Sequence, residues 1–307
     1  MNNLFRLSNN IKWLITFFVI LIFTGPGLSQ SKKLKVYISV DMEGTVGSVT
    51  GDQLGPSGFE YSRFREFMTN ETLAAIKAAK ESGATEILVS DSHGNGENLL
   101  IDKFPEDIRI IRSWSRKLSM MAGIDETFDA AIFIGYHSST TNMEGVRAHT
   151  MSSARLTRVA LNGIDMPEAG INAAIAGHFG VPVVMISGDD AVIKETRSII
   201  GDIEAAEVKK SLGFHSANTL TPAAAYKLIY EKVKTALSRL GDFKPYVLKK
   251  PVTLEVGFKH YRPVEILSYL SLVERIDSHT IRFVGKNILE VSNFLVFITS
   301  YDSNLQP

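Results

Sequence analysis

The chain has 307 residues, enough for one large domain or about two smaller ones, and its 45% apolar content supports a buried core. Basic and acidic residues number 33 each, a balance that argues against a broad basic surface for nucleic acid. The sequence contains no cysteine, so disulfides, iron–sulfur clusters, Cys-ligated zinc and thiol nucleophiles are excluded, and any metal must be held by His, Asp and Glu.

Residues 1–29 have the pattern of a signal peptide. Arg6 and Lys12 precede an apolar run of 11 residues, Trp13–Phe23, which is too short to span a bilayer and fits the hydrophobic region of a secretory signal. We expect cleavage before Gln30; an uncleaved N-terminal anchor is the alternative. The mature protein would then be periplasmic or secreted, with no stable membrane span, and its acidic residues would exceed its basic ones by two.

Four apolar segments predict strands of a parallel sheet. They are rich in β-branched residues and almost free of polar ones, as strands buried on both faces are. Helical patterns separate them, and this alternation predicts a mostly parallel α/β fold with flanking helices. The predicted strands are Leu34–Val40, Glu86–Ser90, Ala130–Tyr136 and Val181–Ser187, and the predicted helices are Ser62–Ser82, Glu168–Phe179 and Asp190–Ile199. Arg155–Ala160 with Asn162-Gly163 predicts an antiparallel hairpin with a type I′ turn.

The pattern changes after about residue 210. We expect a catalytic α/β domain over residues 30–210 and a smaller C-terminal α+β domain over residues 211–307. The elements expected in the second domain are helices at Pro222–Leu240, Pro263–Leu272 and Asn287–Ser300, and strands at Pro251–Phe258 and His279–Val284.

Each of the four predicted strands is followed by acidic residues or a histidine. A single acid after a strand is a common turn or cap residue. Four such strand ends are harder to explain by capping, and in an open parallel sheet this edge is where ligands bind. The residues concerned are Asp41 and Glu43, then Asp91 and His93, then His137, then Asp189 and Asp190.

Asp41 and Glu43 are two positions apart, so in extended backbone their side chains point to the same face. Two adjacent carboxylates repel each other unless a cation lies between them. His93 and His137 would add neutral nitrogen ligands from neighbouring strand ends. This sulfur-free set favours zinc, and less specifically manganese or cobalt, and a bridging carboxylate could hold two ions about 3.5–4 Å apart.

Two further residues have more than one reading from the pattern alone. His149 follows the third strand by twelve residues and could be a functional histidine or a loop histidine with a backbone partner. Glu168 opens a predicted helix, where an acid commonly stabilises the helix dipole, and the pattern alone favours that reading.

A set of motifs in this order and spacing resembles the DppA-type zinc D-aminopeptidases. The resemblance covers nearly all of the mature chain, and the combined set is far more specific than any one motif. The motifs are SVDMEG (Ser39–Gly44), SDSHG (Ser90–Gly94), GYH (Gly135–His137), AHTM (Ala148–Met151), PEAGIN (Pro167–Asn172), SGDD (Ser187–Asp190) and TIRFVGKNILE (Thr280–Glu290).

The resemblance implies an aminopeptidase with two zinc ions that acts on peptides with N-terminal D-amino acids. It implies that His149 is the catalytic histidine and that Asp41 bridges the ions, and it overturns the capping reading of Glu168. It also implies a ring-like homo-oligomer of two stacked pentamers with the sites facing an internal chamber. The implied metal ligands are Asp41, Glu43, His93, His137 and Glu168.

Three residues are weaker candidates for supporting roles. Asn172 could contact the substrate. Asp189 and Asp190 could orient metal ligands from a second layer, or they could cap the helix that follows them.

Three functional hypotheses remain open from the sequence. The first is the D-specific metallo-aminopeptidase, acting on short peptides that could derive from the cell wall. The second is a dinuclear metal hydrolase of another ester or phosphoester, although no Gly-rich phosphate motif follows a strand. The third is a non-catalytic periplasmic protein that binds metal or peptide, which would have no use for His149.

Overall fold

The structure is a computed structural model that describes residues 33–302. The predicted signal peptide lies outside the described residues. Within residues 33–302, no helix is both long enough and apolar enough to cross a membrane.

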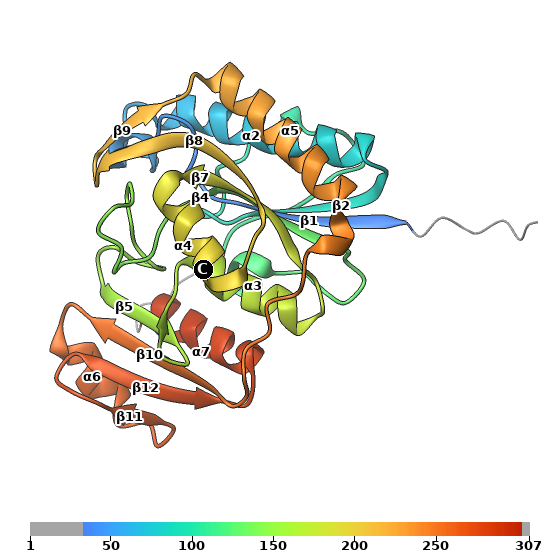
Figure 1. The fold of residues 1–307 in the computed structure, drawn as a ribbon. Coiled ribbons are helices and arrows are strands. Elements are labelled where there is room, and N and C mark those ends of the chain that lie inside the picture. Colours follow the sequence, from blue (N-terminus) through green and yellow to red (C-terminus); the bar gives the residue numbers. More distant parts are fainter. Residues whose placement is uncertain (1–32, 303–307) are drawn as a thin grey trace, which may run out of the picture. The chain divides into compact units, whose positions relative to one another are not determined.

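A seven-stranded sheet, sheet A, contains the four predicted parallel strands (Figure 1). Its strand order is β3-β2-β1-β4-β7-β8-β9, so β1 lies between β2 and β4. All neighbouring strands are parallel except β9, which is antiparallel to β8. The strands are β1 (Leu34–Val40), β2 (Ala84–Asp91), β3 (Arg109–Ile111), β4 (Ala130–Tyr136), β7 (Val183–Asp189), β8 (Glu204–Gly213) and β9 (Ser216–Thr219).

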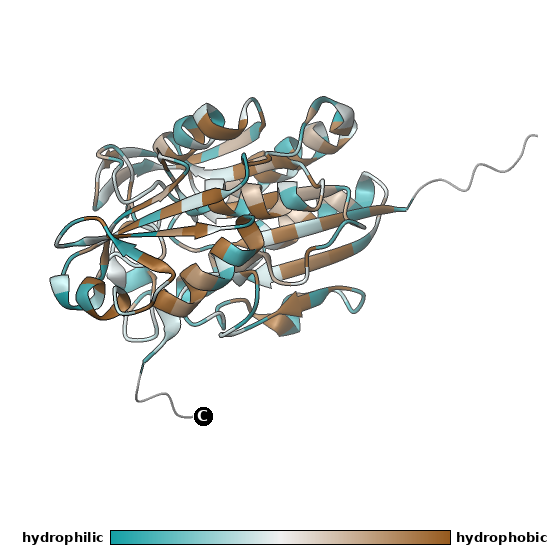
Figure 2. Cartoon of the chain, turned by 90° about the horizontal axis from the view of Figure 1, so that it is seen from below, coloured by the Kyte–Doolittle hydropathy of each residue, from teal (hydrophilic) through white to brown (hydrophobic). Residues whose placement is uncertain are grey.

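Helices cover both faces of sheet A. On one face α2 packs against α5, and on the other face α3 packs against α4 (Figure 1). The central strands β4 and β7 are buried along their whole length, because helices exclude water from both of their faces. Figure 2 shows hydrophobic residues running along these inner strands. The helices are α2 (Tyr61–Glu81), α3 (Glu168–His178), α4 (Asp190–Ile200) and α5 (Pro222–Ser238).

A second sheet, sheet B, is antiparallel and has the strand order β11-β12-β10-β5-β6. The predicted hairpin forms β5 and β6. Asn162 has φ of 49° and Gly163 has φ of 84°, as a type I′ turn requires. Helix α7 contacts both α3 and the strands β10 and β12. The elements are β5 (Leu156–Leu161), β6 (Ile164–Asp165), β10 (Val252–Phe258), β11 (Val273–Arg275), β12 (Thr280–Gly285), α6 (Tyr261–Leu267) and α7 (Ile288–Ser300).

The mixed α/β fold agrees with the prediction, with differences in single elements. The helix expected at Pro263–Leu272 ends at Leu267, and β11 follows it. Strands β3, β8, β9 and β11 have no counterpart among the expected elements. The division at residue 210 stays a prediction; that residue lies within β8. Four short 3-10 helices complete the described chain, at Gly51–Gln53, Ile101–Lys103, Ser119–Met121 and Leu240–Asp242.

Candidate metal centre

Three neighbouring strands of sheet A place the predicted ligands at one edge. Asp41 follows β1, His93 follows β2 and His137 follows β4. Since these strands are parallel and adjacent, their carboxyl ends lie together. The three side chains and that of Glu43 are buried at this edge.

The backbone at the end of β1 lies unusually close to β4. The Asp41 N–H donates to Ile134 O over 2.8 Å, and the Gly44 N–H donates to Gly135 O over 2.7 Å. Gly135 has φ of +71°, and a Cβ atom at this position would lie 2.2 Å from Asp41 O. The glycine of the GYH motif is therefore required, because a side chain there would displace Asp41.

His93 directs one ring nitrogen at two carboxylates. Its Nε2 lies 2.6 Å from Leu54 O, and because a carbonyl only accepts, Nε2 carries a proton. Its Nδ1 lies 3.1 Å from Asp41 Oδ1 and 2.8 Å from Glu43 Oε2. In the neutral ring Nδ1 then has only a lone pair, which faces the oxygens of two acids.

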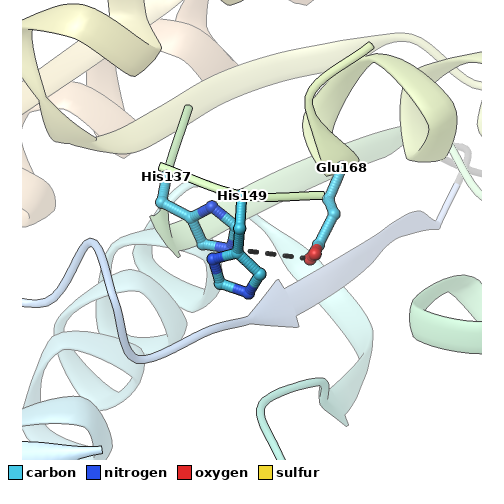
Figure 3. Close-up of side chains that lie close together, drawn as sticks. All are labelled: His137, His149 and Glu168. Atoms are coloured by element: carbon cyan, nitrogen blue, oxygen red, sulfur yellow. Dashed lines mark ion pairs between the residues drawn. The ribbon is translucent and has the colours of Figure 1, made fainter. Parts of the chain in front are cut away.

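His137 repeats this arrangement on the other side of Asp41. Its Nδ1 lies 3.1 Å from Ser138 O, which assigns the proton to Nδ1. Its Nε2 lies 3.2 Å from Asp41 Oδ2 and 3.7 Å from Glu168 Oε2 (Figure 3). Asp41 Oδ2 is buried and receives no hydrogen bond from the described residues.

The pKa values of both histidines reflect this surplus of acceptors. Burial opposes a charge on His93, but the carboxylates of Glu43 and Asp41 outweigh burial and hold its pKa well above the ordinary value. Burial likewise opposes a charge on His137, and the carboxylates of Glu168 and Asp41 raise its pKa to about 10. At both histidines, the neighbouring carboxylates therefore favour a positive charge.

His149 lies against His137 and has a different environment. The two rings stack with centroids 4.1 Å apart and planes 6° apart (Figure 3). His149 Nδ1 lies 2.8 Å from Arg147 O, which leaves Nε2 as a free acceptor. Burial and the neighbouring His137 lower the pKa of His149 to about 4, so its ring is neutral at pH 7.

Glu168 is the first residue of α3, at the position where an acid often serves the helix dipole. Its carboxylate instead faces His137, and its Oε1 accepts a hydrogen bond from the Met151 N–H over 2.7 Å. Burial raises the pKa of Glu168 to about 7, and the neighbouring His137 opposes that shift. Glu168 therefore links the cluster to the segment that carries His149.

These donors fit a divalent cation. Carboxylate oxygens of Asp41 and Glu43 and one ring nitrogen each of His93 and His137 converge there. The raised pKa values of both histidines show that these acids favour positive charge, which a bound cation would supply in place of the protons. In each of the three histidines the other ring nitrogen donates to a backbone carbonyl, as metal-ligating histidines commonly do. Two groups have their donor atoms within 4.8 Å of one another: Asp41, Glu43 and His137, and His137, His149 and Glu168.

A cavity of about 320 Å³ opens onto the cluster. Its walls include the six clustered side chains, together with residues of the loops at Ser92–Gly94 and Trp114–Met120, the segment Met151–Arg155 and the end of α7. This volume is at the lower end of the range for small-molecule sites. The cluster is thus accessible to a small ligand.

Asn172 lies beside the cavity rather than in its wall. Its side chain is buried, and its Nδ2 donates to Tyr136 Oη over 2.9 Å. Asn172 also borders a narrow, mainly apolar recess that shares Met151 and Glu168 with the main cavity. A substrate-binding role for Asn172 stays a prediction.

Asp189 and Asp190 contact backbone groups. Asp189 caps α4 by accepting from the Val192 N–H over 2.8 Å, and it also accepts from the Val146 N–H over 2.8 Å. Asp190 accepts from the Ser211 N–H. Asp189 thereby holds the start of the segment that leads to His149, and a role in orienting metal ligands stays a prediction for both residues.

The sequence reasoning missed a buried lysine beneath the cluster. Lys209 on β8 donates to three backbone carbonyls of the loop after β1: Glu43 O, Thr45 O at 3.1 Å and Ser48 O at 2.6 Å. Glu71 on α2 accepts from the Val46 N–H of the same loop. Burial lowers the pKa of Lys209 to about 8 and raises the pKa of Glu71 to about 8. No local pattern marks either residue, because both act through contacts distant in sequence.

Comparisons with known proteins agree with this arrangement. A family model described as D-aminopeptidase matches residues 34–297. The chain is 33% identical over 267 residues to a D-aminopeptidase of Bacillus subtilis (strain 168), a match covering 87% of this chain and 97% of that relative. It is also similar to the solved structure of the zinc-dependent D-aminopeptidase DppA from Bacillus subtilis, described as a self-compartmentalizing protease. That likeness has a TM-score of 0.84 at 31% identity, and it covers 89% of this chain and 100% of the other.

The α/β fold and the resemblance inferred from the motifs are thereby confirmed. The match extends over both sheets and over every segment that contributes to the cluster. The chain therefore belongs to the D-aminopeptidase family.

Proposed function

We propose that this protein is a zinc-dependent aminopeptidase that removes N-terminal D-amino acids from short peptides, with two zinc ions in each subunit. The observation that carries the proposal is the convergence of buried carboxylate oxygens and imidazole nitrogens at one edge of sheet A, close enough to share a cation. Membership of the D-aminopeptidase family supports the reaction, and the zinc dependence described for DppA supports the metal.

We assign five side chains as metal ligands: Asp41, Glu43, His93, His137 and Glu168. Asp41 would hold both ions, since its Oδ1 faces His93 and its Oδ2 faces His137. His93 and Glu43 would complete one position, and His137 and Glu168 the other. Zinc suits this set because imidazole nitrogen and carboxylate oxygen are both among its usual ligands.

The chemistry is divided between the metals and the protein. Bound zinc supplies Lewis-acid polarisation of the scissile carbonyl. The free α-amine of the peptide would approach the metal centre and its surrounding carboxylates. His149, neutral and with Nε2 free, accepts a proton from the attacking water and delivers it to the leaving amine nitrogen as the peptide C–N bond breaks.

The test is a direct assay of the mature protein. It is stripped with a chelator, reloaded with zinc and assayed on matched D-alanyl and L-alanyl dipeptides, with a phosphate ester as control. We expect turnover of the D-alanyl peptide that is lost on chelation and restored by zinc, with about two zinc ions per chain by metal analysis. Turnover of the phosphate ester alone, or of no D-peptide, would overturn the proposal.

The proposal also covers where the protein is located and how its subunits assemble. The N-terminal signal pattern supports an extracytoplasmic enzyme, for which peptide fragments of the cell wall are a source of D-residues. The self-compartmentalizing character described for DppA supports a ring-like homo-oligomer. Two stacked pentamers are the form that the motif resemblance implies. Cell fractionation and light scattering of the mature chain test both. A cytoplasmic monomer would contradict them without affecting the chemistry.

A further inference from the structure

The charges in the wall of the cavity are unevenly distributed. The acidic residues of the wall, Asp41, Glu43 and Glu168, all belong to the proposed metal centre. Arg155 is the single lysine or arginine of the described chain that contributes to the wall. It precedes β5 of sheet B, and its neighbours in the wall are the last residues of α7. The cavity thus has a cluster of acids and histidines at one place and one guanidinium at another.

The guanidinium of Arg155 is held in position without being neutralised. Its Nη2 donates to Thr299 O over 2.5 Å, and its Nε lies 3.4 Å from Ser152 Oγ. Both acceptors are uncharged, and no acid within residues 33–302 forms an ion pair with it. Since a guanidinium has five N–H donors, most of the fork remains available to a ligand. The side chain is exposed to solvent through the cavity.

The backbone around Arg155 is also fixed. The Lys259 N–H donates to Arg155 O over 2.8 Å, and Lys259 Nζ donates to Ser153 O over 2.5 Å. A second positive charge therefore lies along the same segment. The segment joins the His149 loop to β5, and both His149 and Arg155 contribute to the cavity wall.

A short peptide has an amino group at one end and a carboxylate at the other. The two ends are separated by about 3.3–3.6 Å for each residue of extended chain. A cavity of about 320 Å³ holds a di- or tripeptide but little more. An arginine fork matches the two oxygens of a carboxylate and binds them more strongly than a neutral group.

We propose that Arg155 forms a carboxylate subsite, which binds the C-terminal carboxylate of a di- or tripeptide whose N-terminal residue lies at the metal centre. This inference rests on the proposed aminopeptidase function. The subsite selects against peptide amides, which lack the charge, and against long peptides, whose carboxylate lies beyond the cavity.

The experiment compares D-alanyl-glycine with D-alanyl-glycinamide, which differ only in the terminal charge. Zinc-loaded wild-type protein is assayed beside Arg155→Gln, Arg155→Lys and the control Arg262→Gln, an arginine on α6 outside the cavity wall. We expect the wild-type protein to prefer D-alanyl-glycine, the acid, over D-alanyl-glycinamide, the amide. Arg155→Gln should lose about 10-fold to 100-fold in kcat/KM on the acid, mainly through KM, and little on the amide. Arg155→Lys should retain part of the preference, and the control all of it.

A binding measurement separates this proposal from the proposed function. Calorimetry with zinc-loaded His149→Ala protein measures the affinity for the acid and for the amide without turnover. We expect tighter binding of the acid, and loss of that difference when Arg155→Gln is added. Equal affinity for acid and amide, or equal loss on both substrates in Arg155→Gln, would overturn the subsite. Failure to hydrolyse either substrate would refute the aminopeptidase function and leave the binding result to decide the subsite.

Discussion

The two sheets of this protein present charged side chains in opposite ways. On sheet B, arginines and acids alternate across neighbouring strands, and each acid receives guanidinium hydrogen bonds. Arg158 pairs with Asp165 at 2.6 Å and with Glu255 at 2.8 Å, and Arg282 pairs with Glu255 at 2.9 Å and with Glu274 at 3.1 Å. At the edge of sheet A the buried acids face histidines, whose charge depends on protonation.

This difference shows in which cluster the charges of the acids are balanced by other side chains of the protein. The sheet B network is partly exposed, and every acid in it has a permanently charged partner. The sheet A cluster is buried, and it lacks positive charge unless its histidines gain protons or a metal enters. Both clusters contain several ionisable side chains, so the number of charges alone would not tell them apart. Burial and the lack of a lysine or arginine ion pair among residues 33–302 distinguish the candidate metal site from the structural network.

The strongest test of this contrast is removal of a proposed metal ligand beside removal of the proposed catalytic histidine. Asp41→Asn should lose bound zinc and activity together, because the bridging charge is lost. His149→Ala should lower kcat by about 10²-fold to 10⁴-fold, as expected for a general acid–base group, while zinc content stays near wild type. Metal analysis and steady-state kinetics on the same preparations measure both effects.

Asp165→Asn in the sheet B network is the matched control for Asp41→Asn. It makes the same chemical change to an acid with an arginine partner and should leave zinc and activity unaltered. If His149→Ala also lost zinc, His149 would be a metal ligand, as its proximity to His137 and Glu168 would allow.

The next effect concerns the buried lysine beneath the cluster. Lys209→Met removes three hydrogen bonds to the loop that carries Glu43 and leaves three buried carbonyl groups without that donor. A buried acceptor that loses its partner costs about 1–3 kcal/mol. We therefore expect a destabilisation of that order in denaturant unfolding of the metal-free protein, and weaker zinc binding.

Lys210→Met provides the comparison for Lys209→Met. Lys210 is the next residue of β8, and its side chain is exposed. Its replacement should change the free energy of unfolding by less than about 0.5 kcal/mol. Equal effects of the two substitutions would show that the contacts of Lys209 do not support the loop.

Local sequence patterns were sufficient for the strands that form the cluster. Apolar runs such as Ala130–Tyr136 can be recognised because strands buried on both faces exclude polar residues. The acids and histidines that follow these runs were predicted to lie together for the same topological reason. The Asn162-Gly163 turn was also predictable, because few residues adopt positive φ at both positions.

Other features depend on contacts that no local pattern encodes. Sheet B joins β5 and β6 to strands that follow much later in the chain, and this pairing is set by packing. Glu168 has the pattern of an ordinary helix-opening acid, and only the family motif indicated its role. Arg155 was assigned to a hairpin strand, whereas the structure places its side chain in the cavity wall.

A smaller effect tests the turn of sheet B. Gly163 has φ of +84° and nothing within 4 Å of a Cβ atom built there, so Gly163→Ala introduces backbone strain without a clash. Left-handed backbone costs a non-glycine residue about 1–2 kcal/mol. We expect that loss in thermal or denaturant unfolding, with zinc content and activity at pH 7 unchanged.

Gly241→Ala is the matched glycine control. Gly241 lacks a left-handed φ and also has nothing within 4 Å of its Cβ position. Its replacement should be neutral or slightly stabilising, because alanine restricts the unfolded chain. A loss of zinc in Gly163→Ala would mean that sheet B and the metal centre are more tightly coupled than the contrast between them implies.

The smallest expected effect is the pH dependence of the sheet B network. Hydrogen bonds from Arg282 and then Arg158 lower the pKa of Glu255 below its ordinary value. Because the folded pKa is the lower one, the stabilisation is present above the unfolded pKa of 4.5 and is lost as the pH falls through the folded value. Glu255→Gln should therefore be less stable than wild type at pH 7, by under about 1 kcal/mol since the pairs are partly exposed. The difference should shrink toward zero near pH 3 in unfolding of the two proteins measured side by side. A difference that stayed constant with pH would indicate that Glu255 contributes through packing, and the sheet B network would then not be an electrostatic counterpart of the metal centre.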